Sequence, residues 1–214
     1  KVSFEANWLI EEFMLLANRS VTEFVATKRK DCTFVYRVHD EPNQEKLETF
    51  RLFARSFGYK LPPDLGGLKA SRELKKLFDK AKGTPEFPAL ELMCLRCMAK
   101  AKYDVENIGH YGLNFKYYTH FTSPIRRYPD MMVPRLLAQY LDGAKSADKA
   151  YYEGQCKHAS DREQVAADAE RASVKYKMVE YMQERVGYTY EGTVSGLTEW
   201  GMYVEILPTH IEGM

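Results

Sequence analysis

Two adjacent arginines, Arg126 and Arg127, stand in the segment HFTSPIRRYPD, residues 120–130. Ser123 can cap a helix through its side-chain oxygen, and Pro124 suits the first helical position, where no N–H is needed. The free N–H groups and positive dipole end of such a helix favour a bound phosphate or carboxylate. Each guanidinium can hold an anion through two parallel hydrogen bonds. The segment therefore predicts an anion-binding corner; the alternative is a capped helix whose arginines pair with neighbouring acids.

Cations and aromatic rings gather around this corner. Residues 113–139 carry four cations against a single acid: Lys116, Arg126, Arg127 and Arg135 against Asp130. The rings interleaved with them are Phe115, Tyr117, Tyr118, Phe121 and Tyr128. Unstacked bases can lie on such rings while arginines follow the phosphates, so the surface suits single-stranded RNA. In an alternating strand, about half of the rings would belong to the core instead.

A metal or redox site is the other chemistry that the residue types allow. The four cysteines include one C-x-x-C pair: Cys94 and Cys97, with Cys32 and Cys156 elsewhere. Within LELMCLRCMAK the pair falls on one apolar helical face, where free cysteine is commonly buried. Zinc would need two further ligands, so a buried pair is the favoured interpretation. His110 and His120 are each predicted to be a hydrogen-bonded structural or RNA-contacting residue, not a metal ligand.

The amino-acid sequence of the corner resembles a family signature. Residues 117–137 read YYTHFTSPIRRYPDMMVPRLL, which resembles the signature of the RNase R and RNase II family of exoribonucleases. EANWLIEEFMLLAN at 5–18 looks like the family's helix ahead of that signature, and VYRVHDEPNQEKL at 35–47 looks like the segment that follows it. With HYGL at 110–113, the resemblance covers roughly residues 1–185, and motifs of this length are specific.

The resemblance implies a magnesium-dependent enzyme that shortens single-stranded RNA from its 3′ end, one nucleotide at a time, to nucleoside monophosphates. The family holds its metal ions with four clustered aspartates that precede the EEFM helix. No run of closely spaced aspartates occurs in this chain, and Asp161 and Asp168 stand alone. A two-metal site needs several carboxylates close together. We therefore expect part of an exoribonuclease that lacks the metal acids, does not itself bind magnesium and is inactive alone.

The resemblance also implies roles for single residues. Arg126 is expected to stabilise charge on the scissile phosphate. Residues in and around the corner are expected to contact RNA: Arg127, Tyr128, Lys116, Arg135 and His120. Glu11 or Glu12 is expected to contact the RNA near its 3′ end, and Glu170 aligns loosely with a glutamate that the family places near RNA. For these three acids, the alternative is solvated helix surface.

The elements that must position these residues are mostly helices. Apolar spacing and end signals predict helices over 5–30, 42–58, 71–82, 86–100 and 147–184, the last with Gly154 as a weak point. A short strand is predicted over 32–38, and residues 105–121 are predicted to be extended and to lead into the corner. One face of the first helix is predicted to be core: Leu9, Ile10, Phe13, Met14, Leu16, Ala17 and Val21.

Pro134 departs from the family pattern, which usually has histidine at this position. Proline in a helix interior removes one hydrogen bond and costs about 3 kcal/mol. We expect the helix either to bend or to restart there. Both would shift Arg135 relative to Arg126.

The C-terminal residues have a different pattern. Residues 187–206, GYTYEGTVSGLTEWGMYVEI, alternate apolar and polar side chains around a turn at 198–201, as two antiparallel strands would. They resemble the opening of the OB-fold RNA-binding domain repeated in the largest small-subunit ribosomal protein, a five-stranded barrel. Only two or three of its strands fit before Met214, and a hairpin alone is marginal in water. We expect the hairpin to be disordered, to pack on the helices or to pair with another copy.

The predicted fold class is α+β. A mostly helical C-terminal part of an RNB-type catalytic domain, with a few strands, is expected over 1–185, and an incomplete OB-fold domain over 186–214. With 214 residues and 45% hydrophobic content, the chain can bury one good core.

Composition limits the partners. No apolar run approaches the roughly 20 residues that span a bilayer, so no membrane role is expected and the cytoplasm is the default location. A net charge of +1 gives no global attraction to nucleic acid, so RNA affinity must come from local clustering. No obligate protein partner is evident. Two alternatives remain: a non-catalytic RNA-binding protein on the same scaffold, complete as written, and a helical scaffold with no RNA role, which the corner and the aromatic rings oppose.

Overall fold

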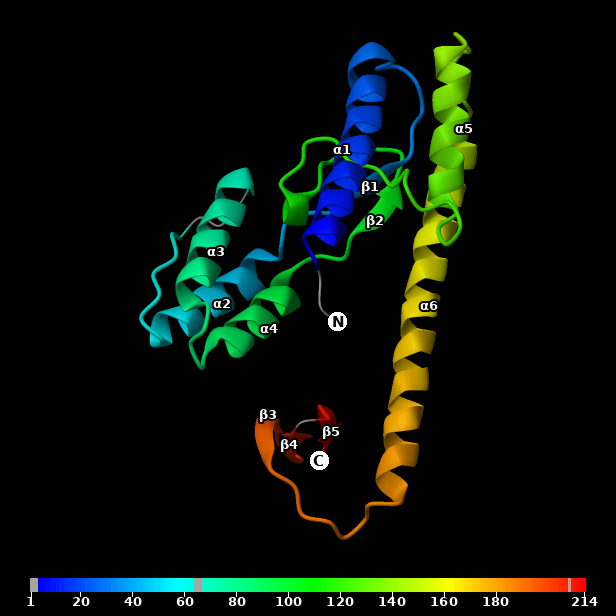
Figure 1. The fold of residues 1–214 in the computed structure, drawn as a ribbon. Coiled ribbons are helices and arrows are strands. Elements are labelled where there is room, and N and C mark those ends of the chain that lie inside the picture. The colour runs from blue at the N-terminus through cyan, green and yellow to red at the C-terminus, as the bar shows by residue number, and fades with distance from the viewer. Residues whose placement is uncertain (1–3, 64–66, 208) are drawn as a thin grey trace. The chain divides into compact units, whose positions relative to one another are not determined.

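The chain has an α+β fold in a computed structural model that describes residues 4–63, 67–207 and 209–214 (Figure 1). Contacts divide it into two compact units, residues 1–161 (unit 1) and residues 162–214 (unit 2). Unit 1 contains α1 (Glu5–Lys28), β1 (Tyr36–Val38), α2 (Gln44–Ser56), α3 (Gly67–Ala81), α4 (Phe87–Cys97), β2 (Lys102–Asp104), the 3-10 helix η1 (Tyr111–Leu113), α5 (Pro129–Leu141) and the first part of α6 (Lys149–Gln183). Among the described residues, no helix is both long and apolar enough to cross a membrane.

One core of unit 1 lies where α1, the β1–β2 pair, α5 and the start of α6 meet. β1 and β2 are antiparallel, with Arg37 opposite Tyr103. Buried side chains from every one of these elements fill this core: Val25, Phe34, Val38, Tyr103, Met132, Val133, Leu136, Tyr140 and Cys156. This core packs α5 against α1. The segment that leads into α5 contains the two arginines.

A second core holds α2, α3 and α4 together. Its buried residues come from all three helices and from η1: Leu47, Phe50, Ala54, Leu74, Leu77, Leu90, Cys94, Cys97 and Tyr111. The predicted helix over 42–58 is confirmed as α2, since the Asn43 side chain accepts from Lys46 N at 3.1 Å and Gly58, at φ +87°, follows its end. α3 begins at Gly67, before the predicted start at residue 71.

The first helix is confirmed, but the prediction for its core face is wrong. Leu9, Ile10 and Phe13 are 57%, 58% and 58% exposed, while Asn18 and Thr22 are buried. Only the C-terminal half of α1 packs on the first core, through Val25 and, partly, Val21. No described residue covers the N-terminal half of α1, so its apolar side chains are exposed to solvent.

α6 is one continuous helix of 35 residues and is not broken at Gly154, the predicted weak point. α5 likewise continues through Pro134, so the predicted restart there is wrong. Residues 105–121 are not uniformly extended as predicted. They turn through η1, after which Asn114 adopts φ +57°.

Unit 2 contains the rest of α6 and a three-stranded antiparallel sheet in the order β3 (Gly192–Thr198), β4 (Gly201–Ile206) and β5 (Ile211–Gly213). Thr198 pairs with Gly201, which confirms the predicted hairpin around Glu199 and Trp200. Side chains from α6 and the β5 end of the sheet line a cavity of about 470 Å³: Ser173, Val174, Lys177, Met178, Tyr181, Thr209 and Ile211. Which of the three expected states the hairpin takes stays a prediction.

Candidate functional site

The two arginines lie in a turn, not at a helix start. Arg126 N and Arg127 N donate to Ser123 O at 3.3 and 3.2 Å, and the helix α5 begins later, at Pro129. The prediction that Ser123 caps a helix with Pro124 at its first position is therefore wrong. The proline that occupies a first helical position is Pro129, whose missing N–H costs nothing there. The arginines thus precede the dipole of α5, and an anion here would be held by side chains.

Arg127 is held by a buried acid. Its Nη2 donates to Asp130 Oδ2 at 2.7 Å, and the same oxygen accepts from Ser123 N at 2.7 Å. Asp130 is fully buried, and the Arg127 side chain is 19% exposed. For Arg127, the structure realises the alternative in which an arginine pairs with an acid.

Arg126 faces solvent beside exposed neighbours. Its side chain is exposed, and among the described residues no ion pair or side-chain hydrogen bond engages it. Ile125 is 102% exposed and Tyr128 is 51% exposed. The turn therefore presents one unengaged guanidinium and one available ring to solvent.

His120 lies behind the turn as a neutral residue. Its Nδ1 is 2.8 Å from Tyr103 OH. Burial, and then the charges of Arg127, Arg37 and Arg126, lower the pKa of His120 to about 3. The pKa of His110 is likewise lowered to about 4, first by burial and then by His39 and Arg37. Both histidines are uncharged at neutral pH, so neither adds positive charge to the site.

The two depressed pKa values predict that the chain loses stability in acid. Below the usual histidine pKa of 6.5, the unfolded state binds protons that the folded state does not take up until about pH 4. The free energy of unfolding should therefore fall as pH decreases from 6.5, by about 2 kcal/mol per histidine at pH 5. Urea unfolding of wild type and His120→Gln at pH 7 and 5 measures this difference.

In that experiment, His120→Gln should lose less stability between pH 7 and pH 5 than the wild type. His158→Gln removes an exposed histidine of α6 and serves as the matched control, which should behave as wild type. An identical pH dependence in wild type and His120→Gln would contradict the assignment of a neutral, buried His120.

Asn18 is a residue of the site that the sequence analysis missed. Its side chain is buried and accepts from Phe121 N at 3.0 Å through Oδ1, while Nδ2 donates to Tyr118 OH at 3.2 Å. Thr22, one helical turn later, is also buried. The signal was present in the sequence: two polar residues four apart interrupt an apolar helix, where buried polar groups need partners. Asn18 ties the segment before the turn to α1.

Some of the rings near the turn are core, as the alternative interpretation holds. Tyr118 is 5% exposed, and Phe121 packs partly buried against the first core. Phe115 carries the Arg19 guanidinium 4.4 Å from its ring centroid. Tyr128 is therefore the ring of this group that the structure leaves most open to a base.

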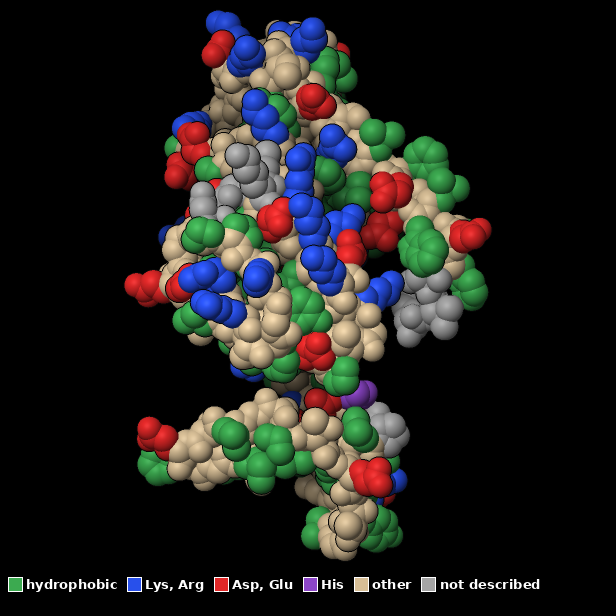
Figure 2. Space-filling view, turned by 90° about the vertical axis from the view of Figure 1, so that its left-hand side faces the viewer, with side chains coloured by type: hydrophobic (Ala, Val, Ile, Leu, Met, Phe, Trp, Pro, Cys, Tyr) green, Lys and Arg blue, Asp and Glu red, His purple; other side chains and the backbone are tan. Residues whose placement is uncertain are grey.

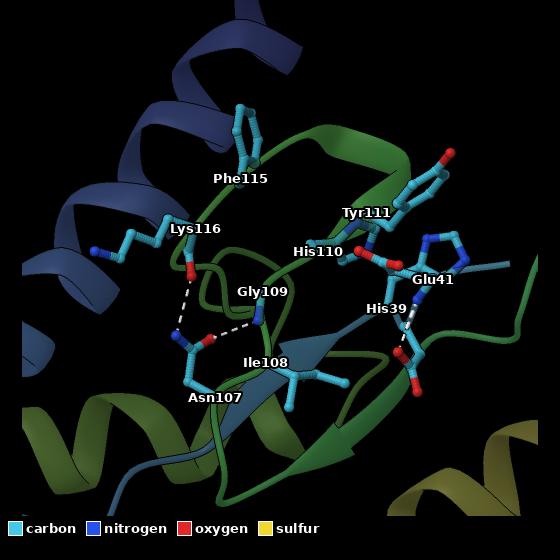
Figure 3. Close-up of a pocket in the computed structure, with 10 residues that line it drawn as sticks. His39, Glu41, Asn107, Ile108, Gly109, His110, Tyr111, Phe115 and Lys116 are labelled. Carbon is cyan, nitrogen blue, oxygen red and sulfur yellow. Dashed lines mark hydrogen bonds between the residues drawn. The ribbon is translucent and has the colours of Figure 1, made fainter. Parts of the chain in front are cut away.

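Lys116 lies at the edge of a separate cavity of about 370 Å³ (Figure 3). Asn107 fixes the loop, because its Nδ2 donates to Lys116 O at 3.0 Å and its Oδ1 accepts from Gly109 N at 3.2 Å. The Lys116 side chain is exposed, with Nζ 5.3 Å from the Tyr117 ring centroid. Its ammonium group is thus available to a phosphate.

Arg135 and Tyr128 are both near enough to Tyr152 on α6 to shift its pKa. Burial raises the pKa of Tyr152 on α6, Tyr151 and Tyr128 raise it further, and Arg135 lowers it. Arg135 is exposed on α5, on the turn of helix that follows Pro134.

All three predicted acids are exposed. Glu11 and Glu12 are exposed on the N-terminal half of α1, and Glu170 is exposed on the part of α6 that belongs to unit 2. Among the described residues no ion pair engages any of the three; beside Glu170, Arg171 pairs with Asp168 at 3.1 Å. Their contacts with RNA stay predictions.

The described residues do not fit a magnesium site. In residues 4–63, 67–207 and 209–214 no group of three or more His, Cys, Asp or Glu side chains could hold a metal ion. The cysteines also fit a structural role. Cys94 and Cys97 are buried and free, and Cys97 Sγ donates to Met93 O at 3.1 Å. Burial raises the pKa of Cys94 and Cys156 to about 12, which keeps both thiols protonated and unreactive.

A second basic surface lies over α2–α4, and the sequence analysis did not identify it. Lys46, Lys75 and Arg96 line a cavity of about 1,110 Å³ whose apolar wall includes Phe78 and Phe87. Figure 2, which faces these helices, shows Lys and Arg side chains gathered over them. The near-zero net charge of the whole chain conceals this local excess of cations.

Comparisons with known proteins agree on one family. The RNB domain model matches residues 1–143. Ribonuclease R 1 of Lactococcus lactis is 40% identical over 215 residues, which covers 98% of this chain and 26% of that protein. Ribonuclease R of Aquifex aeolicus is 36% identical over 214 residues, which covers 98% of this chain and 30% of that protein.

Solved structures give the same answer. The Mycoplasma genitalium RNase R in complex with ribose-methylated single-stranded RNA matches 100% of this chain and 34% of that chain, with a TM-score of 0.87 and 26% identity. Yeast Ssd1, described as a pseudonuclease, matches 96% of this chain and 26% of that chain, with a TM-score of 0.80 and 27% identity. This chain spans about a quarter to a third of the length of these proteins. Since the family model matches more than half of the chain, the chain belongs to the RNB domain family.

Proposed function

We propose that this chain is part of a processive 3′→5′ exoribonuclease that hydrolyses single-stranded RNA to nucleoside monophosphates in the cytoplasm. The observation that carries the proposal is the contrast within the turn. Arg127 is neutralised by buried Asp130, whereas Arg126 is exposed and unengaged among the described residues. A guanidinium in this state can grip a phosphate through two parallel hydrogen bonds and stabilise charge as the phosphodiester is cleaved.

Other exposed side chains of unit 1 support an RNA strand as the ligand. Tyr128 offers a ring to a base, and Lys116 and Arg135 offer exposed cations to phosphates. The structural similarity to an RNase R bound to single-stranded RNA agrees with this proposal. The expected contacts of Arg127 and His120 with RNA are not part of the proposal, because both side chains are engaged inside the protein.

Under this proposal, residues outside this chain would hold the magnesium ions. The described residues do not provide its ligands, so the carboxylates would come from sequence outside this chain. We also propose the domain division at residues 185–186, with the β3–β5 sheet as the opening of an OB-fold domain that binds RNA. No protein partner is required by this account.

A second candidate is a non-catalytic RNA-binding protein on the same scaffold. One observation favours it: the similarity to yeast Ssd1, which is described as a pseudonuclease. Both candidates predict RNA binding, and cleavage separates them.

RNA binding by this chain predicts an effect of Lys116→Ala. Removing one phosphate contact should weaken binding and reduce the slope of log K against log salt by about 0.7 for a single strand. Fluorescence anisotropy of a 5′-labelled single-stranded RNA, titrated at several NaCl concentrations, measures both. Lys30→Ala removes an exposed lysine beyond the C-terminal end of α1 and should leave the slope unchanged. An unchanged slope in Lys116→Ala would show that Lys116 contacts no phosphate.

A further inference from the structure

Asp130 connects three parts of the site through one oxygen atom. It is fully buried in the first turn of α5. Its Oδ2 accepts from Ser123 N at 2.7 Å, at the start of the turn, and from Arg127 Nη2 at 2.7 Å, at its end. The backbone closes the same loop, because Asp130 N donates to Arg127 O at 3.2 Å. A single carboxylate oxygen thus holds the turn closed on the helix.

The geometry of this ion pair is not the strongest available to it. Asp130 Oδ1 and Arg127 Nε are both buried and have no partner among the described residues. An arginine paired for strength alone would place two parallel N–H groups on the two carboxylate oxygens. Leaving buried polar atoms without a partner is costly. The Asp130 carboxylate is therefore placed to accept from both Ser123 N and Arg127. In this position it does not form the two parallel hydrogen bonds with the guanidinium.

Asn18 fixes the same segment from α1. Asn18 Oδ1 holds Phe121 N at 3.0 Å from α1, and Asp130 Oδ2 holds Ser123 N from α5. Phe121 and Ser123 are alternate residues, and neither belongs to a strand. Two buried side chains thus take the place of a strand partner in the segment that leads to Arg126.

We propose that Asp130 is the positioning residue of this turn: it neutralises Arg127, fixes the Ser123 backbone and so leaves Arg126 as the turn's one cation presented to RNA. This inference rests on the proposed function. A turn with two free arginines could hold a phosphate in two registers, whereas one free and one bound arginine define a single register. Precise placement of the reacting phosphate is what such a site must supply.

The salt dependence of RNA binding tests this division of roles. Asp130→Asn keeps an acceptor for Ser123 N but loses the charge, so it releases Arg127. The slope of log K against log salt, measured with a 5′-fluorescein-labelled single-stranded RNA, should then steepen by about 0.7, the value for one added phosphate contact. The double variant Asp130→Asn with Arg127→Gln should return to the wild-type slope. Arg127→Gln alone should leave the slope unchanged.

Asp104 provides a matched control. Its Oδ1 accepts from Glu106 N at 3.0 Å and its Oδ2 pairs with Lys102 at 2.7 Å, so it combines a backbone N–H and a cation as Asp130 does. Asp104→Asn should not steepen the slope. Three results would overturn the proposal: a shallower slope in Arg127→Gln alone, a wild-type slope in Asp130→Asn, or equal steepening in Asp104→Asn.

A second measurement does not depend on RNA. Hydrogen exchange of the Ser123 amide, followed by NMR on chains whose circular dichroism shows a folded protein, should be slow in wild type and Asp130→Asn. In Asp130→Ala it should be fast, and equal rates in all three would overturn the positioning role. If wild type bound no RNA while Ser123 exchange followed this pattern, the proposed function would fail and the fixation of the turn by Asp130 would stand.

Discussion

Arg126→Ala is expected to abolish RNA shortening while RNA affinity changes little. If the guanidinium acts mainly on charge that develops as the phosphodiester is cleaved, its loss falls on the rate and not on ground-state binding. Removal of one such donor typically costs about 100- to 1,000-fold in kcat. Cleavage can be measured in a chimera in which residues 1–214 replace the matching segment of Lactococcus lactis ribonuclease R 1, which is 40% identical over 215 residues. Affinity is measured by anisotropy.

Ile125→Ala is the control for this substitution. Ile125 lies in the same turn, is 102% exposed and has no charge, so its truncation tests whether the turn itself is disturbed. It should leave both rate and affinity near wild type. Equal losses of rate and affinity in Arg126→Ala would mean that the arginine contributes uniform binding, which contradicts its assigned role.

The second large effect is expected for Asp130→Ala, on stability. The substitution leaves the Arg127 charge without its partner and Ser123 N without an acceptor in a buried setting. Breaking a buried ion pair by removing one partner is strongly destabilising, and because Arg127 keeps some exposure we expect a loss of about 3 kcal/mol. Urea unfolding of the whole chain measures it.

Two variants make this result specific. Asp130→Asn retains an acceptor for Ser123 N and should lose less stability than Asp130→Ala. Asp104→Ala breaks a partly exposed pair with Lys102, whose side chain is 57% exposed, and should cost about 1 kcal/mol or less. A loss in Asp130→Ala no larger than that in Asp104→Ala would contradict a buried pair at the turn.

Local patterns predicted most of the elements. α2 followed from end signals, Pro42 before the helix and Gly58 after it, and the β3–β4 hairpin followed from alternation on both sides of a short turn. Both signals lie within a few residues of the structure that they specify. The α+β class and the family also followed, because long contiguous motifs carried the resemblance.

The errors came from tertiary contacts that local patterns do not show. Leu9 and Ile10 have the spacing of a core face, but no described element covers them, and periodicity alone cannot show which neighbour is present. Ser123 and Pro124 have the types of a helix start, yet Asp130, seven residues later, binds Ser123 N and holds a turn instead. Local propensity was outweighed by one buried carboxylate.

Part of the candidate site could be predicted from the sequence, and part could not. The arginine pair and Tyr128 were found from residue type and spacing, but the different states of Arg126 and Arg127 depend on burial. Asn18 lies 103 residues before the Phe121 N–H that it binds, a separation that sequence spacing cannot relate. Position in the motif indicated the candidate site, and the fold distinguished the states of its two arginines.

A denaturing-gel time course of a 5′-labelled single-stranded RNA with magnesium tests the central claim most directly, namely that this chain handles RNA for a nuclease whose metal acids lie outside it. We predict that the wild-type chimera with Lactococcus lactis ribonuclease R 1 shortens the RNA stepwise and that residues 1–214 alone leave it intact. Shortening by the chain alone would contradict the absence of a metal site. An intact RNA with a folded chimera would contradict the nuclease assignment and favour the non-catalytic RNA-binding protein.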